Sequence, residues 1–318
     1  MVDFDLNIDP TKVKEKLISS IKATVEKQQT TGALVFFDGQ NDSFVNAKLA
    51  IEALGLDSVK LIIIIDIPES KRKEISFQAT ELLNIPLEKI IIFDIEEIVS
   101  QFEAFEAIPK LLGVYRDPRI VTRYKPNVVG LLLRSEHVHK MFEEKTLLMM
   151  GKSKSEREEF LQKAIAHNKL RKRMETLLTF LIAERESLTV INQTNKTEWL
   201  TGLVTWFGYG HAADIMPLAD LYRTQTLQLA ESLGIPKEVR ELLFTDIIPG
   251  IDDEYQYFFE LDSFAVDQIL VRLDGGLSAD KISEELDLDL EKVERVQNFY
   301  EVSKFQRTLP FIPKVHDL

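Results

Sequence analysis

The chain has 318 residues, of which 45% are hydrophobic, and a formal net charge of −13 at pH 7. This length predicts either one large domain with an appendage or two domains, with a sizeable core. The negative charge argues against binding to nucleic acid, and the absence of cysteine excludes disulfides and thiolate chemistry. The longest apolar run, "LIIIID" at residues 61–66, is too short to cross a bilayer, and the acidic N-terminus is no secretory signal. We therefore expect a cytoplasmic protein that has no membrane segment.

The N-terminal part of the chain predicts helices and strands in alternation. Its first helix carries one apolar stripe at helical spacing, formed by Val13, Leu17, Ile21 and Val25. The expected order is helix 10–28, strand 33–37, helix 43–54, strand 61–67, helix 70–83 and strand 90–94. The strands are unbroken apolar runs, which is typical of a parallel sheet covered on both faces. We therefore predict an α/β fold with a Rossmann-like open parallel sheet.

The second half of the chain is predicted to be mostly helical. Residues 100–160 are interpreted as an insertion or a mobile connection. A long helix over 158–186 then leads to a fourth strand at 188–192 and a further α-rich region. The tail from Leu261 holds short helices with apolar spacing suited to packing. We expect one domain over 1–260 and a helical extension over 261–318 that packs on it.

The stretch "LVFFDGQNDSFVNAKLAIEALG", residues 34–55, reads as a buried strand, a tight polar turn and an amphipathic helix. In an open parallel sheet such a turn lies at the carboxyl edge, where ligands bind. Backbone N–H groups at the start of the helix favour anions. Many parallel sheets have such turns and bind nothing there, so the turn alone leaves both interpretations open.

Further motifs follow this turn in the order of a known family. They are "AIAHNKLRKRMETLLTFLIAERESLTVINQTNKTEWLTG" at 164–202, "HAADIMPLADLYRTQTLQLAESLGIPKEV" at 211–239 and "PGIDDE" at 249–254. Together they resemble the NAD synthetase family, from the first strand to the final "RTLPFIPK", with residues 100–160 unmatched. The resemblance implies the adenine nucleotide alpha-hydrolase-like fold of the ATP pyrophosphatases and usually a homodimer. Because no amidase domain precedes the chain, the similarity is to the ammonia-dependent form.

The resemblance also implies a reaction and its ligands. Members of the family use magnesium-ATP to adenylate the carboxylate of deamido-NAD, and ammonia then displaces AMP. The family turn reads S-G-G-x-D-S, and Gly39, Asp42 and Ser43 match it, which implies that they bind ATP. Asp42 is also implied as a magnesium ligand, although an acid at a helix start can serve simply as a cap. Glu198 matches the second magnesium acid and is otherwise an ordinary loop carboxylate.

Three further residues are implied as ligand contacts. Arg171 matches an arginine that contacts deamido-NAD, a suitable role for a bidentate fork, although "KLRKR" is equally consistent with a solvated helix face. Asp214 matches an acid that helps to hold the dinucleotide. Arg223 replaces a lysine that reaches the ATP phosphates, so the charge stays while the shape changes.

Two departures fall in the turn itself. Asp38 replaces a serine beside the expected pyrophosphate, and two unit charges about 4 Å apart cost roughly 4 kcal/mol at an effective dielectric of about 20. This would suppress nucleotide binding unless Asp38 turns away or takes a metal. Gln40 replaces a glycine, and a non-glycine residue at positive φ is strained by roughly 1–3 kcal/mol.

Other departures fall elsewhere on the implied ligand contacts. Trp206 replaces a lysine that contacts the dinucleotide, and the family's "YGD" acid is absent, with Tyr209 or Gly210 in its place. The remaining changes place apolar or amide side chains where the family has hydroxyl or basic ones, at Gln193, Phe244, Phe305 and Gln306.

Two function classes therefore remain. The first is a divergent ammonia-dependent NAD synthetase, or a relative that adenylates another carboxylate. The second is a catalytically silent or repurposed member that keeps the fold and the dimer and binds a partner or another ligand. The helix around Met174–Leu181 is apolar on more than one face, which also favours a homodimer.

Overall fold

The computed structural model describes residues 4–65, 80–95, 154–208, 210–240 and 254–308, together with residues 74, 77 and 98. Most of the helix expected at 70–83 lies outside these ranges. The same holds for the insertion assigned to 100–160, up to residue 153.

A four-stranded parallel sheet forms the centre of the molecule. Its strands are β1 (Gly32–Phe36), β2 (Val59–Ile65), β3 (Ile90–Asp94) and β4 (Leu188–Ile191), in the spatial order β3-β2-β1-β4. In β1, Ala33 lies opposite Val59 on one side and Thr189 on the other. Every residue of β1 is buried, as expected for a central strand covered on both faces. The predicted α/β fold with an open parallel sheet is confirmed.

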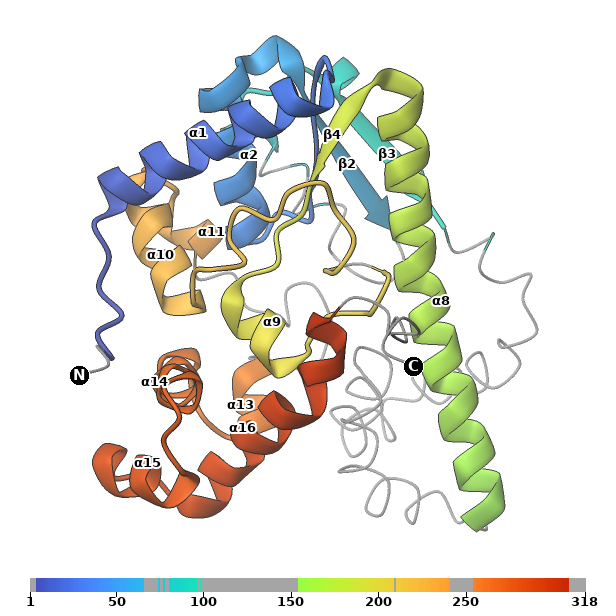
Figure 1. Ribbon diagram of the computed structural model, residues 1–318. Helices are drawn as coiled ribbons and strands as arrows, with labels where there is room; N and C mark the ends of the chain where they lie inside the picture. Colours follow the sequence, from blue (N-terminus) through green and yellow to red (C-terminus); the bar gives the residue numbers. More distant parts are fainter. Residues whose placement is uncertain are drawn as a thin grey trace, which may run out of the picture.

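Helices cover both faces of the sheet (Figure 1). The face that carries the side chains of Ala33 and Val35 is covered by three helices, α1 (Pro10–Gln28), α2 (Asn41–Leu54) and α10 (Arg223–Ser232). The other face, which receives Leu34 and Phe36, packs against α8 (Lys154–Glu186). The alternation follows from the two-residue period of a strand. Helix α8 begins four residues before the predicted start, and α2 begins two residues before its own.

The remaining helices lie mostly beyond the carboxyl ends of the strands (Figure 1). They are α9 (Lys196–Thr201), α11 (Lys237–Arg240), α13 (Glu254–Phe259), α14 (Ser263–Asp274), α15 (Ala279–Leu286) and α16 (Leu290–Val302). Short 3₁₀ helices are η1 (Leu56–Ser58), η2 (Leu87–Lys89) and η4 (Ser303–Arg307). The C-terminal helices share a core with Leu6, Leu200 and Tyr222, which precede residue 260. The division into a domain over 1–260 and a packed helical extension over 261–318 stays a prediction.

Helix α8 has a buried side and an outer side. Leu178 and Ile182 are buried against the sheet, whereas Leu177 is 60% exposed and Leu181 is 54% exposed. Among the residues that the structure describes, no helix is long and apolar enough to cross a membrane.

Candidate functional site

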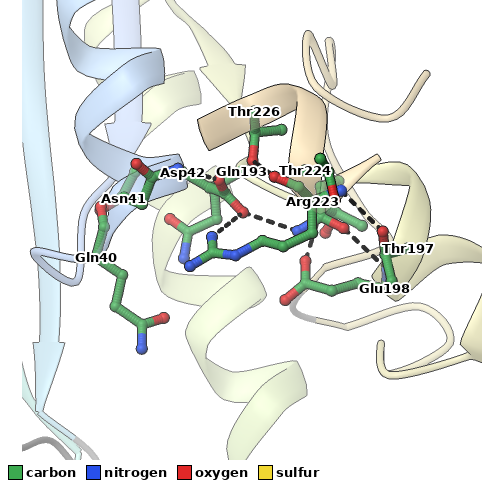
Figure 2. A network of polar contacts seen from close by, with 12 residues as sticks. Gln40, Asn41, Asp42, Gln193, Thr197, Glu198, Arg223, Thr224 and Thr226 are labelled. Carbon is green, nitrogen blue, oxygen red and sulfur yellow. Dashed lines mark hydrogen bonds and ion pairs between the residues drawn. The ribbon is translucent and has the colours of Figure 1, made fainter. Parts of the chain in front are cut away.

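The turn between β1 and α2 takes its shape from Gly39. This residue has a φ of 81°, a conformation that strains residues with a side chain. Gln40 instead has an extended backbone, with φ −80° and ψ 167°, at the N-cap of α2. The prediction of strain at Gln40 is therefore wrong, because the turn needs its conformational freedom one residue earlier. The Gln40 side chain points away from the polar network of Figure 2.

Asp38 is buried and its carboxylate is held inside the turn. Its Oδ1 accepts hydrogen bonds from the Gln40 N–H at 2.9 Å and from the Ser43 hydroxyl at 2.8 Å. Its Oδ2 accepts from Nε2 of Gln193 at 2.6 Å. Asp38 and Gln193, two departures from the family pattern that are 155 residues apart, are therefore partners. Asp38 neither turns out of the site nor meets a second acid; it satisfies donors of the turn itself.

Asp42 lies in the first turn of α2 and is also buried. Its Oδ1 accepts from Nδ2 of Asn41 at 2.8 Å. Its Oδ2 accepts from Nδ2 of Asn195 at 2.8 Å and is 3.1 Å from Nη1 of Arg223. Asp42 thus does more than cap the helix, because it links α2 to the starts of two other helices.

Glu198 is fixed by the start of α9. The Asn195 side chain accepts from the Glu198 N–H at 3.0 Å, and Oε2 of Glu198 accepts from the Asn195 N–H at 3.3 Å. This reciprocal capping box satisfies two otherwise unpaired donors of the helix end. Asn195 therefore connects Glu198 to Asp42. Sequence reasoning did not assign Asn195 to the site, although the N-x-x-E spacing of a capping box was there to be read.

Arg223 is the first residue of α10, and its side chain extends toward Asp42 (Figure 2). Burial disfavours its charged form, but the negative charges of Asp42 and Glu198 outweigh this effect and raise the pKa of Arg223. The guanidinium therefore stays charged, with both predicted magnesium acids acting on it.

The same geometry allows a test of whether magnesium fits. Within the described ranges, no group of three or more His, Cys, Asp or Glu side chains could hold a metal ion by itself. Magnesium in nucleotide sites commonly uses one or two carboxylates and completes its shell with water and phosphate oxygens. Asp42 lies 3.1 Å from Arg223, and Asn195 hydrogen-bonds to both Asp42 and Glu198, so two hard oxygen donors belong to one network. The donor set fits magnesium that arrives with a phosphate ligand.

The two residues implied as dinucleotide contacts lie on different elements. Arg171 is buried on α8, and the adjacent Lys172 is buried and paired with Glu175 at 2.9 Å, so this part of the helix is no solvated face. The carboxylate of Asp214 accepts from the Val190 N–H at 2.7 Å and from Gln28 at 2.9 Å. These contacts tie Asp214 to β4 and α1.

A second cluster gathers several of the remaining departures. The Trp206 ring stacks on Phe207 with centroids 4.5 Å apart and meets Phe305 edge-on at 5.5 Å. His211 lies 5.4 Å from Phe207, and its Nε2 donates to the Gln306 carbonyl at 3.0 Å. Burial lowers the pKa of His211, against the smaller opposite effect of that hydrogen bond. We call Trp206, Phe207, His211 and Phe305 the aromatic cluster; Phe244 and Tyr209 lie outside the described residues.

The loop of this cluster packs against the loop that follows β4. The Thr194 hydroxyl donates to the Gly210 carbonyl at 2.8 Å. Gly210 has a φ of 82°, and a Cβ there would lie 2.9 Å from the Val204 side chain and 3.1 Å from the Thr194 hydroxyl oxygen. A glycine is required at this position, so the acid of the family's "YGD" has no room at Gly210.

Asp267 is a buried acid that sequence reasoning missed, and it is hydrogen-bonded to the residues that position Arg223. Asp267 on α14 accepts hydrogen bonds from the Thr197 hydroxyl and, at 2.7 Å each, from the N–H and hydroxyl of Thr224. Thr197 in turn accepts from the Arg223 N–H at 2.9 Å. Burial raises the pKa of Asp267 to about 6, although these hydrogen bonds oppose the rise. No sequence signal marked this acid, which lies among apolar residues of one helix.

The sheet order, the turn after β1 and the carboxylates around Arg223 define an α/β protein with a candidate nucleotide site at the carboxyl edge of its sheet. Comparison with known proteins agrees: residues 136–310 match the family model described as NAD synthase. The NH(3)-dependent NAD(+) synthetase of Thermotoga maritima is 31% identical over 303 residues, covering 94% of this chain and 98% of that protein. The chain belongs to the NAD synthase family.

Other relatives and solved structures agree with this assignment. The NH(3)-dependent NAD(+) synthetase of Methanocaldococcus jannaschii is 25% identical, covering 96% of this chain and 97% of that protein. The NMN synthetase of Francisella tularensis superposes with a TM-score of 0.64 at 19% identity, covering 96% of this chain and 99% of that one. An NH3-dependent NAD synthetase of Campylobacter jejuni gives a TM-score of 0.62 at 19% identity, with 97% and 100% covered. At this identity the structures establish the fold alone.

Proposed function

We propose that this protein is an ammonia-dependent NAD synthetase. The observation that carries the proposal is the convergence of Asp42, Glu198 and Arg223 from three separate elements at the carboxyl edge of the sheet. Membership of the NAD synthase family supports the same reaction.

The proposed reaction has two steps. A carboxylate oxygen of deamido-NAD attacks the α-phosphorus of ATP, and the bond to the leaving pyrophosphate breaks. Ammonia then attacks the carbonyl carbon of the acyl adenylate, loses a proton, and AMP leaves with its bonding electron pair. The products are NAD, AMP and pyrophosphate, so no oxidant or reductant is required.

Within this proposal each residue has a role at the charged end of the substrates. Asp42 and Glu198 hold magnesium, which would neutralise charge on the phosphates when bound. Arg223 keeps its positive charge in the buried network and offers a guanidinium to a phosphate oxygen. Gly39 and Ser43 shape the turn toward ATP, and Arg171 and Asp214 are proposed contacts of deamido-NAD.

An assay of AMP release tests the proposal directly. AMP should form only when ATP, deamido-NAD, ammonia and magnesium are all present. Asp42→Asn removes one magnesium ligand and should lower turnover at least about a hundredfold. Asp57→Asn is the matched control, because Asp57 is exposed and precedes β2, at the opposite edge of the sheet. Equal ATP affinity with and without magnesium in titration calorimetry would contradict the assignment of Asp42 and Glu198.

A second candidate function is binding without catalysis. The observation that favours it is the aromatic cluster, where rings stand in place of two basic residues of the family pattern. A silent member would release no AMP under any combination of substrates while it still bound a nucleotide or a partner. The same assay therefore separates the two functions.

We further propose a homodimer formed through the outer side of α8, in a protein of the cytoplasm. Leu177 and Leu181 are more than half exposed one helical turn apart, so burying them would stabilise a second copy on this face. Sedimentation of the double variant Leu177→Lys with Leu181→Lys should show a monomer, whereas Glu284→Lys, an exposed position on α15, should stay dimeric. A stable monomer of the unaltered chain at micromolar concentration would refute the dimer.

A further inference from the structure

The hydrogen-bond donors of the turn after β1 already bind a carboxylate of the protein itself, that of Asp38. Oδ1 of Asp38 takes the Gln40 N–H at 2.9 Å and the Ser43 hydroxyl at 2.8 Å. A backbone N–H at a helix start and a neighbouring hydroxyl are the groups that commonly bind a phosphate oxygen in this position. Here a buried carboxylate, only 3% exposed, takes the N–H and competes for the hydroxyl with the Gln40 carbonyl, which lies 2.9 Å from it.

Gln193 adds a contact that local turn geometry does not explain. A bond from Asp38 to an N–H two residues ahead is a common local feature of turns. The bond from Nε2 of Gln193 to Oδ2 of Asp38, at 2.6 Å, comes instead from the loop after β4. Gln193 is itself buried, so this bond is formed away from water, where its loss costs most. Both oxygens of Asp38 are thereby fixed in the turn.

We propose that Asp38 is a built-in anion that occupies a phosphate position of the turn and that Gln193 holds it there. The carboxylate of Asp38 thereby weakens the binding of polyphosphates at this turn without abolishing it. An ATP or pyrophosphate phosphoryl group at the turn must displace a buried carboxylate of the same charge and compete for its donors. A nucleoside monophosphate lacks the distal phosphates, so Asp38 affects its binding much less. This inference deepens the proposed function, because it concerns the ATP side of the same site.

Titration calorimetry on the full chain, with inorganic pyrophosphate and AMP as separate probes, tests the selectivity. Asp38→Ser frees the Gln40 N–H and the Ser43 hydroxyl and should tighten pyrophosphate binding at least about tenfold, while AMP binding changes less than about threefold. Asp38→Asn removes the charge at nearly constant shape and should also increase the affinity for pyrophosphate. If the unaltered protein already binds pyrophosphate as tightly as both variants, or if AMP gains as much as pyrophosphate, the proposal is wrong.

A double-mutant cycle tests the positioning role of Gln193. Gln193→Ala should tighten pyrophosphate binding by a smaller factor than Asp38→Ser, because Asp38 keeps its two contacts in the turn. In the Asp38→Ser background the same change should have no effect. An equal effect of Gln193→Ala in both backgrounds would show that Gln193 does not act through Asp38. Asp57→Asn serves as the charge-matched control and should leave both probes unchanged.

Two controls keep the result independent of folding and of catalysis. Urea unfolding of each variant identifies any loss of native protein, and Asp38→Asn carries the test if Asp38→Ser does not fold. Pyrophosphate binding needs no turnover, so it is measured even if AMP release fails. Tightened pyrophosphate binding by the variants, with no AMP release from the unaltered protein, would refute the proposed function and support the role of Asp38. AMP release from the unaltered protein, with no tightening in the variants, would support the proposed function and refute that role.

Discussion

Two neighbouring parts of the site have changed in different ways. In the polar network around Asp42, the unusual residues Asp38, Gln193 and Arg223 each have a hydrogen-bond or ion-pair partner inside the site. In the aromatic cluster, Trp206 and Phe305 pack ring against ring where the family pattern has basic side chains. The first part keeps charges that can act on a phosphate or a metal. The second has aromatic side chains in place of basic ones, so the two parts should respond differently to substitution.

The largest effect is expected at the centre of the polar network. Arg223→Ala leaves the buried carboxylate of Asp42 without its cation and should reduce the free energy of unfolding by about 3 kcal/mol. Arg185→Ala is the control, because Arg185 forms a largely exposed pair with Glu186 and should cost less than about 1 kcal/mol. Urea unfolding measures both. Similar costs for the two variants would mean that the Asp42 pair contributes no more than a surface contact.

An effect of similar size is expected from pH, through the buried carboxyl group of Asp267. The pKa of Asp267 is raised from 3.8 to about 6 in the folded protein, so the folded state binds the extra proton. Its contribution to stability is therefore present below pH 3.8 and is lost as pH rises toward 6, by about 3 kcal/mol in total. Asp267→Asn should remove this loss between pH 4 and 7. An identical pH dependence of the variant and the unaltered protein would contradict the raised pKa.

The aromatic cluster should show a moderate coupling between its rings. Trp206 and Phe305 are in edge-on contact at 5.5 Å, an arrangement worth about 0.5–1.5 kcal/mol beyond simple burial. A double-mutant cycle with Trp206→Ala and Phe305→Ala should give a coupling energy in this range. As a control, Trp206→Ala with Phe264→Ala should be additive, because Phe264 is exposed and lies on α14, outside the aromatic cluster. Additivity of the first pair would indicate two rings that merely lie near each other.

The smallest effect is expected at Phe207. This residue has a φ of 55°, which strains a bulky side chain by about 1–3 kcal/mol, and it is 46% exposed. Phe207→Asn relieves that strain but loses the stacking on Trp206, so the free energy of unfolding should change by less than about 1 kcal/mol. Trp206→Ala, measured in the same urea titrations, should cost clearly more. Equal costs would show that backbone strain at Phe207 is absent or is not relieved by asparagine.

The sequence by itself determined the sheet and the positions of its turns. Unbroken apolar runs fixed β1, β2, β3 and β4 to within two residues, because a central parallel strand must be apolar on both faces. Gly55 likewise marked the end of α2, because helix termini have local signals, whereas its start was predicted two residues late, at Ser43. The ordered motifs also indicated the family. These features depend on neighbours along the chain, which a sequence displays directly.

Only the tertiary structure decided how the departures from the family pattern are used. Asp38 and Gln193 are 155 residues apart, and Trp206 lies in a loop whereas Phe305 lies in η4, so no local pattern could pair them. The conformation of Gln40 also differed from the expectation that this position of the turn needs a positive φ, because in this turn Gly39 takes the positive φ and Gln40 is extended. Asp267 carried no signal, since its hydrogen-bond donors come from two other helices. The same physical reason applies to the two residue pairs, to Gln40 and to Asp267. The role of a side chain depends on the groups that surround it, and the fold brings those groups together.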